Sequence, residues 1–259
     1  MDDAFDISVF WPLVFGPHIW GSRVRAEGEI NVKRILKQRA QVAVPDKDRH
    51  QYLRSFGFSP DVVADVGVHS GTPQLYRAFA DSKFVLIDPR PESEAETFAN
   101  NAPQNYDFHA VAVGASQGQM DLKIPIMRKG ENAAMAGFRK VTGPMGRNIV
   151  DYEIRSVPIL TLDQIMADYP GRVGLKIDTE GYELEVLQGA AATLRRAEFV
   201  IIELSVTKRF EDVAPPSRVV AELAAAGLEL RDILRITGDG KGGPQPRLFD
   251  ALFTRWDVP

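Results

Sequence analysis

The stretch VGLKIDTEGYELEVLQGA, residues 173–190, decides how the chain folds, because it joins a buried strand to a helix through a turn crowded with acids. RVGLKID has the apolar character of a strand buried on both faces, and ELEVLQGAAATLRRA has the spacing of an amphipathic helix. A helix that only had to pack would not need carboxylates at its start. The strand exit is therefore a candidate functional site, and it holds Lys176, Asp178, Glu180, Glu183 and Glu185.

Similar apolar runs recur on both sides of this stretch. DVVADVG (61–67), KFVLID (83–88) and YDFHAVAVG (106–114) precede it, and AEFVIIEL (197–204) follows it. Helical patterns lie between several of these runs, and TLDQI has the capping-box spacing of Thr161 and Gln164. Alternating strands and helices predict a parallel α/β sheet with right-handed crossovers.

The C-terminus departs from this alternation. LELRDILRIT and RLFDALFTRW are separated by the turn-forming segment GDGKGGPQP, with no helix between them. Two strands connected in this way must run antiparallel. We therefore predict an α/β sheet that is mostly parallel and carries an antiparallel C-terminal hairpin at one edge.

Bulk composition narrows the class of protein. The chain has 259 residues, 44% of them hydrophobic and 25% charged, which is ordinary for a globular protein. A net charge of −4 argues against a general nucleic-acid binder. The absence of cysteine removes disulfides and thiolate chemistry, and the acidic, proline-interrupted N-terminus lacks the features of a signal peptide or a membrane span. We expect a cytoplasmic protein.

Two regions are predicted. Residues 1–55 are expected to be a helical N-terminal extension, and residues 56–259 the main domain. The region from Phe10 to Trp20 is too apolar to be left in water. It is expected either to cover the acceptor site as a lid or to form the contact of a homodimer.

Two strand exits have the features of a nucleoside site. DVGVHSG contains Asp65, Gly67 and Gly71, and glycines there allow close approach of a ligand, although a tight turn with Asp65 as its cap is the alternative. Asp88 ends the next strand, where an acid accepts ribose hydroxyls or caps a helix. Without G-x-G-x-x-G spacing or a Walker lysine, S-adenosylmethionine is favoured over NAD or ATP.

Together these segments resemble the FkbM-type methyltransferases, a branch of the class I S-adenosylmethionine-dependent methyltransferases with a Rossmann-like fold. The resemblance covers about residues 60–205 and rests on ADVGVHSG, LIDPRPE, HAVAVG, TLDQI, LKIDTEGYELEVLQGA and IIEL. The antiparallel hairpin is also what the class I fold implies. The resemblance departs in three places: Asp88 stands where the family often has Glu, AVAVG has no acid, and His69 interrupts the glycine loop.

The resemblance implies roles for nine residues. Four contact the cofactor through its methionine and ribose: Asp65, Gly67 and Gly71 line the methionine part, and Asp88 holds the ribose. His69 either touches the cofactor or covers it. Adenine is faced by Ala112 and Val113, and the sulfonium by Asp178 and Glu180.

The acids at residues 178–180 have a chemical rationale. Carboxylates are favoured beside a sulfonium in a poorly solvated cleft, and a hydroxyl acceptor must also lose its proton. We predict Asp178 near the cofactor and Glu180 as acid/base or substrate clamp. A divalent cation held by this pair is the alternative. Lys176 is expected to neutralise the cluster, and Glu203 to border the substrate side or cap a loop.

The acceptor side is predicted to include residues 125–156, a long connection rich in cations. It is expected to be either a lid for an anionic acceptor or a solvated loop. The chain is thus predicted to O-methylate a sugar or secondary-metabolite hydroxyl. An inactive S-adenosylmethionine-binding regulator and a nicotinamide-dependent oxidoreductase are the alternatives. The cations of the connection are Arg128, Lys129, Arg139, Lys140 and Arg147.

Overall fold

A computed structural model describes residues 50–128, 130–238 and 246–256 of the chain. Residues 1–49 of the predicted N-terminal extension lie outside the described residues. The lid or dimer contact expected for this extension therefore stays a prediction. Lys129 and the hairpin loop at residues 239–245 lie outside them as well.

The apolar runs of the sequence form a seven-stranded sheet in the order β10-β11-β9-β8-β1-β2-β3. Five of these strands are parallel, and β11 runs antiparallel to both of its neighbours. The predicted mostly parallel sheet with a C-terminal hairpin is confirmed. Its strands are β1 (Val62–Val66), β2 (Lys83–Ile87), β3 (Tyr106–His109), β8 (Val173–Ile177), β9 (Ala197–Ser205), β10 (Leu228–Gly238) and β11 (Pro246–Arg255).

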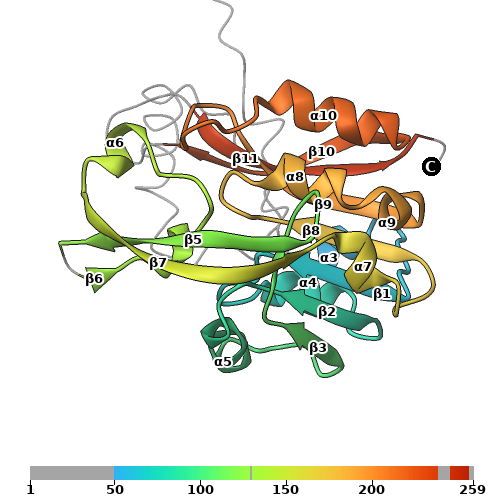
Figure 1. Cartoon of the computed structure of the whole chain (residues 1–259). Coiled ribbons are helices and arrows are strands. Elements are labelled where there is room, and N and C mark those ends of the chain that lie inside the picture. Colours follow the sequence, from blue (N-terminus) through green and yellow to red (C-terminus); the bar gives the residue numbers. More distant parts are fainter. Residues whose placement is uncertain (1–49, 129, 239–245, 257–259) are drawn as a thin grey trace, which may run out of the picture.

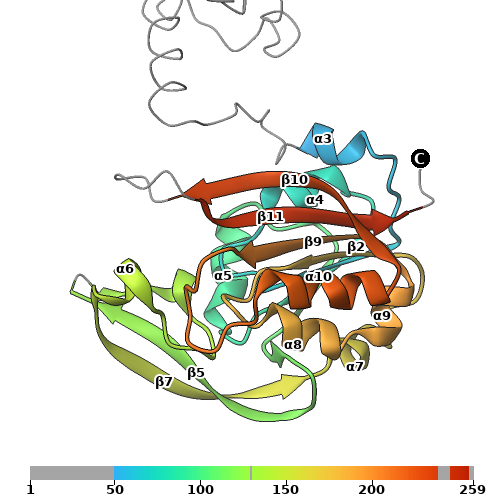
Figure 2. The same cartoon turned by 90° about the horizontal axis from the view of Figure 1, so that it is seen from above.

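Helices cover both faces of this sheet (Figure 2). One face packs against α3 (His50–Arg54) and α4 (Pro73–Ala78). The other packs against α7 (Leu162–Met166), α8 (Glu183–Gln188), α9 (Ala191–Arg195) and α10 (Pro216–Ala225). The single helix predicted after β8 is thus two short ones, α8 and α9. A further helix, α5 (Glu92–Ala99), follows β2. None of the helices in the described ranges is long and apolar enough to cross a membrane.

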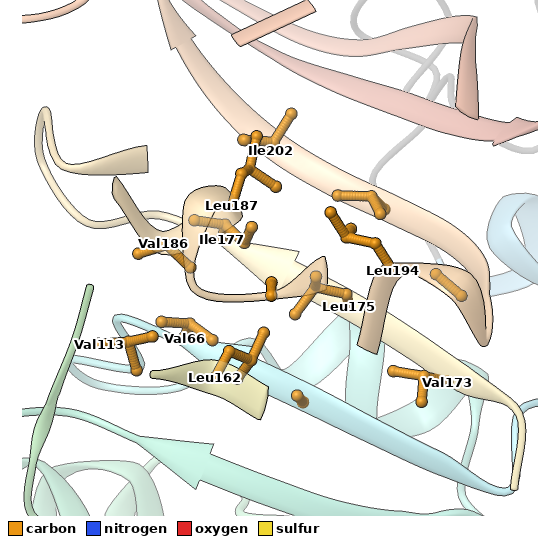
Figure 3. Close-up of a cluster of buried hydrophobic side chains, with 14 of the residues drawn as sticks. Val66, Val113, Leu162, Val173, Leu175, Ile177, Val186, Leu187, Leu194 and Ile202 are labelled. Carbon is orange, nitrogen blue, oxygen red and sulfur yellow. The ribbon is translucent and has the colours of Figure 1, made fainter. Parts of the chain in front are cut away.

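The larger core lies between the sheet and the second helical layer. Figure 3 shows Leu187 of α8 and Leu162 of α7 meeting side chains from the central strands, among them Ile177. All three are at most 1% exposed. Burying each such side chain contributes about 1.5–3 kcal/mol, so the central strands are held at fixed positions and their exits are held with them.

Residues 125–156 differ in part from the predicted long connection, because both of their ends belong to strands, whereas residues 132–148 form a connection with only two short helical turns. A second sheet has the order β4-β7-β5-β6 and lies beside the ends of the large sheet (Figure 1). Its inner face buries Leu122, Ile124, Val157 and Ile159. The predicted strand 106–114 is divided between the two sheets. The additional elements are β4 (Ala112–Val113), β5 (Gly118–Met127), β6 (Gly130–Glu131), the 3₁₀ turn η2 (Ala133–Met135), α6 (Gly143–Gly146) and β7 (Ile149–Leu160).

The predicted capping box at the start of α7 is confirmed. The Thr161 hydroxyl accepts from the Gln164 amide at 3.1 Å, and the Gln164 side chain accepts from the Thr161 amide at 2.9 Å. We expect Thr161→Ala to lower the free energy of unfolding by about 1 kcal/mol, because the backbone amide of Gln164 loses the hydroxyl that accepts its hydrogen bond. Urea unfolding measures this. The exposed Ser116→Ala is the matched control, and equal losses in both variants would contradict the assignment.

Candidate active site

A cavity of about 430 Å³ opens where the parallel strands end. The exits of β1, β2, β8 and β9 form its floor, β4 and residues 133–138 form one wall, and the C-terminal hairpin forms the opposite wall. Ligands of open α/β sheets bind at this edge, and the volume is typical of a small-molecule site. Of the nine predicted site residues, the structure brings eight to this cavity.

The loop after β1 follows the cavity with its backbone in left-handed conformations. Gly67 has φ 79°, His69 φ 47° and Gly71 φ 91°. A Cβ on Gly67 would lie 1.8 Å from the carbonyl oxygen of Asp178, so only glycine fits between these strand exits. His69 adopts a conformation that costs a non-glycine residue energy, and such strain clusters at functional sites. All three loop residues line the cavity.

Asp88 lies at the exit of β2 and is only 6% exposed. Its two carboxylate oxygens accept one backbone hydrogen bond each, from His69 at 2.8 Å and from Arg90 at 2.9 Å. Burial raises the pKa of Asp88, and these hydrogen bonds oppose that shift. Asp88 therefore ties two loops together, and its carboxylate also lines the cavity, where a ligand hydroxyl can donate to it.

Asp65 is placed differently from the prediction. Its side chain is fully buried beneath the cavity and is not among the residues that line it. The hydroxyl of Tyr76 donates to one carboxylate oxygen at 2.9 Å, and Lys176 Nζ lies 3.5 Å from the other. Tyr76 comes from the helix that follows the glycine loop, and its ring covers this acid. Asp65 thus reaches the cavity only through Lys176.

Ala112 and Val113 form the short strand β4 and are both buried at the cavity wall. Neither they nor the neighbouring Val111, which also lines the cavity, offers a polar side chain. Recognition of a polar ring edge on this wall therefore falls to backbone groups.

The acids after β8 lie on the turn at residues 178–181. Lys176 Nζ is 3.5 Å from Asp178 Oδ2, so this lysine lies between Asp65 and Asp178. Glu180 has φ 51°, and its Oε2 accepts from Arg209 Nη2 at 2.9 Å. Arg209 Nη1 also donates to Glu203 Oε1 at 2.5 Å. One guanidinium thus joins the acid of the β8 exit to the acid of β9.

The crowding of charge shifts several pKa values. Burial raises the pKa of Glu180, and Asp178 and Glu203 raise it further, whereas Arg209 lowers it. Burial likewise raises the pKa of Glu203, to about 7. For Lys176, burial works against the charge, but Asp65 and Asp178 outweigh it and raise the pKa. Proton sharing among acids near neutral pH is typical of catalytic sites.

The same acids match part of a cation site. Asp178, Glu180 and Glu203 each offer a carboxylate oxygen, and these oxygens lie within 4.8 Å of one another. Oxygen ligands of this kind suit Mg²⁺. Arg209 already donates to two of the three acids, so a divalent cation would have to share them with a guanidinium. The divalent cation stays an alternative.

Several of the residues that line the cavity were not predicted as site residues, among them three charged ones that follow β9 or come from the hairpin. Arg209 follows β9, and Arg235 and Asp250 come from the hairpin. Arg235 Nε donates to Asp250 Oδ2 at 2.7 Å, and its Nη2 lies 3.6 Å from Glu203 Oε2. Asp250 is a charged residue within the apolar run RLFDALF, which is a usable sequence signal. Arg209 has no local pattern that could have identified it.

The four described cations of the predicted lid, Arg128, Arg139, Lys140 and Arg147, do not line this cavity. Residues 133–138 contribute small and aromatic side chains to the wall. Arg139 instead donates to Glu185 at 2.5 Å and to the Gly181 carbonyl at 3.0 Å. Arg128, Lys140 and Arg147 are exposed. These described cations do not line the cavity, so they do not support the expected anionic acceptor, which stays a prediction.

Comparison with known proteins identifies relatives. A sequence family described as "Methyltransferase FkbM domain" matches residues 61–238. The crystal structure of a methyltransferase FkbM from Methylobacillus flagellatus KT is 14% identical, with a TM-score of 0.50, over 87% of this chain and 52% of that protein. This chain thus spans about half of that relative's length.

A second solved structure is magnesium protoporphyrin IX methyltransferase from Synechocystis PCC 6803 with bound SAM. It is 10% identical over 98% of this chain and 100% of its own, with a TM-score of 0.43. No curated protein sequence matches the chain. The first of the two structures supports the class I methyltransferase fold.

The raised pKa of Glu203 predicts a pH-dependent stability. A buried acid that binds its proton more tightly in the folded state stabilises the fold at low pH, and this contribution is lost as pH rises from 4.5 to about 7. We expect the stability of Glu203→Gln, relative to the unaltered protein, to improve by roughly 1–3 kcal/mol between about pH 5 and pH 8. Urea unfolding at both pH values measures this difference. The exposed Asp81→Asn is the control, and a pH-independent difference for Glu203→Gln would contradict the assignment.

Proposed function

Since the chain belongs to the FkbM methyltransferase family, we propose that it transfers the methyl group of S-adenosylmethionine to a hydroxyl group on a sugar or secondary metabolite. One observation carries the proposal. The glycine loop, the acid of β2 and the acids after β8 all line a single cavity of about 430 Å³. A nicotinamide-dependent oxidoreductase finds no support in this family or in the glycine spacing.

The residues present fit S-adenosylmethionine. Gly67 and Gly71 line the cavity with a backbone along which the methionine part can lie, and the Asp88 carboxylate, which also lines the cavity, is an acceptor for the ribose hydroxyls. Ala112 and Val113 offer an apolar wall to the adenine ring. Asp65 supports this half of the site from beneath, through its contact with Lys176.

The acids at the exit of β8 favour binding of the positively charged sulfonium of the cofactor at that end of the cavity. When bound, S-adenosylmethionine supplies a methyl group on positively charged sulfur, whose carbon–sulfur bond breaks as the acceptor oxygen attacks. Asp178 lines the cavity with a half-buried carboxylate, which favours a positive charge strongly in a poorly solvated cleft. Alignment of the two reactants can supply roughly 7–11 kcal/mol of the barrier reduction.

Glu180 is assigned to proton transfer. An acceptor hydroxyl must release its proton as the new bond to carbon forms, and a carboxylate within reach accepts it. Burial and neighbouring acids raise the pKa of Glu180, which makes it a stronger base than an ordinary carboxylate. Acceptor-dependent formation of S-adenosylhomocysteine separates this enzyme from an inactive S-adenosylmethionine-binding regulator.

Cofactor binding can be tested without knowing the acceptor. S-Adenosylhomocysteine at 100 times its Kd should stabilise the protein by about 2.7 kcal/mol, which raises Tm by roughly 5–10 °C. Gly67→Ala should abolish this shift, because its Cβ would collide with the Asp178 carbonyl at 1.8 Å. Gly57→Ala is matched in backbone strain, with φ 75° against 79°, but its Cβ meets nothing within 4 Å. Equal Tm shifts in the two variants would remove the glycine loop from the site.

The proposed role of Glu180 in proton transfer leads to a second prediction. It can be tested after an acceptor has been identified by screening compounds for the release of S-adenosylhomocysteine. Glu180→Gln should lower kcat by a factor of roughly 10²–10⁴, because the amide cannot take the hydroxyl proton. Binding of S-adenosylhomocysteine should persist. The exposed Glu211→Gln, from the segment that carries Arg209, is the control. An unchanged kcat in Glu180→Gln would assign the proton transfer elsewhere.

A further inference from the structure

Lys176 differs from the arginines of the cavity, because its side chain makes no hydrogen bond within the described ranges. Arg90, Arg209 and Arg235 all line the cavity, and each donates a hydrogen bond to an acid of the chain. Lys176 lines the cavity with a side chain that is 15% exposed. Its Nζ lies 3.5 Å from one oxygen of each of two acids, and no described residue accepts a hydrogen bond from it. Its N–H groups are therefore donors that a ligand in the cavity can use.

The acid beneath Lys176 is incompletely paired as well. Asp65 is fully buried, and the Tyr76 hydroxyl donates to its Oδ2 at 2.9 Å. Its Oδ1 has no hydrogen-bond partner among the described residues and lies 3.5 Å from Lys176 Nζ. Hydrogen bonds from nitrogen to oxygen are about 2.7–3.2 Å long, so the two groups attract one another without forming one.

Neutralisation of the acids alone would favour a closer contact. Lys83, at the start of β2, has its Nζ 2.7 Å from Asp107 Oδ1, which is a full hydrogen bond. Lys176 lies between two acids and approaches neither to that distance. Buried polar groups of folded proteins are nearly always hydrogen-bonded. A buried ammonium that faces a cavity and lies apart from both of its acids therefore indicates a further acceptor inside the cavity.

The position of Lys176 identifies the ligand group that it meets. Lys176 and Asp65 are register partners in β8 and β1, so both side chains lie on the same face of the sheet. The glycine loop begins two residues after Asp65, and Gly67 and Gly71 line the cavity along the path proposed for the methionine part. That part ends in an α-carboxylate and an α-ammonium. Of these two groups, only the carboxylate accepts hydrogen bonds from a lysine.

The charges of the site and of the cofactor are complementary. Two acids and one lysine, Asp65, Asp178 and Lys176, give this part of the site one net negative charge. S-Adenosylmethionine has two positive groups, the sulfonium and the α-ammonium, and one negative carboxylate, so it carries one net positive charge. With its carboxylate on Lys176, the cofactor places opposite charges in contact and leaves Asp178 for a positive group.

We propose that Lys176 binds the α-carboxylate of the methionine part of S-adenosylmethionine, and that Asp65 positions the lysine from beneath. This inference rests on the proposed function. It gives Lys176 a role in cofactor binding in addition to the neutralisation of acids expected from the sequence. It also explains how Asp65 serves the cofactor without lining the cavity.

Two ligands differ in this carboxylate alone, and neither requires a methyl acceptor. S-Adenosylhomocysteine carries the carboxylate. Decarboxylated S-adenosylhomocysteine has an aminopropyl chain in its place and keeps the ammonium. The unaltered protein should bind the first ligand more tightly. Lys176→Met should lower the affinity for S-adenosylhomocysteine roughly 10- to 100-fold, because the carboxylate loses a charge-assisted hydrogen bond. The affinity for the decarboxylated ligand should not fall, because it has no group that the lysine binds.

Isothermal titration calorimetry of both ligands at neutral pH measures these affinities. The matched control is Lys83→Met, which removes an ion-paired lysine from the opposite end of the parallel strands and should leave both affinities unchanged. Lys176→Met leaves Asp65 buried without its cation. The double variant Asp65→Asn/Lys176→Met removes both charges and should show the same loss of preference for the carboxylate.

The outcomes are distinguishable. A selective loss of S-adenosylhomocysteine affinity in Lys176→Met supports the inference. Equal losses for both ligands, or unchanged affinities, overturn it and leave the proposed function standing. If Lys176→Met does not fold, the same criteria apply to the double variant. Equal affinities of the unaltered protein for the two ligands also overturn the inference. Failure of the unaltered protein to bind either ligand overturns the proposed function and the inference together.

Discussion

The close contact between the exits of β1 and β8 is the constraint on which the site depends. Asp178 N donates to Val66 O at 3.0 Å, and a Cβ on Gly67 would lie 1.8 Å from Asp178 O. Parallel pairing of the two strands creates this contact. It brings a glycine loop and an acidic turn, far apart in sequence, onto one wall. Without a glycine at that point the strand exits would separate, and the two segments would no longer lie side by side at the cavity.

Two buried cations of the site, Lys176 and Arg209, contact their neighbouring acids at different distances. Lys176 lies at 3.5 Å from both Asp65 and Asp178, distances that indicate attraction without a short hydrogen bond. Arg209 makes much shorter contacts with Glu180 and Glu203. Each cation thus faces two acids, but only the acids at Arg209 are engaged by short hydrogen bonds, so the Asp178 carboxylate is the one less occupied by the chain's own cations.

The sequence was informative wherever a local pattern follows directly from burial or from backbone conformation. Buried parallel strands read as apolar runs, and Gly67 and Thr161 stand at positions that their roles require. The sequence was misleading where contacts between distant segments determine the position of a side chain or the conformation of a segment. Asp65 reads as a strand-end acid, but Tyr76 covers it. Strands β5 and β7 read as a loop because their exposed residues interrupt the alternation, and Arg209 lies on a segment with no periodicity.

The two halves of the cavity come from different parts of the fold. The proposed donor half is built on β1, β2 and β8, whose register is fixed by a continuous apolar core. The proposed acceptor half is bordered by residues 133–138 and by the hairpin pair Arg235 and Asp250, whose side chains lie outside that core. Substitutions at these exposed or cavity-facing side chains would leave the core side chains of the central strands in place. The proposed acceptor side can therefore vary while the framework of the proposed donor site is kept.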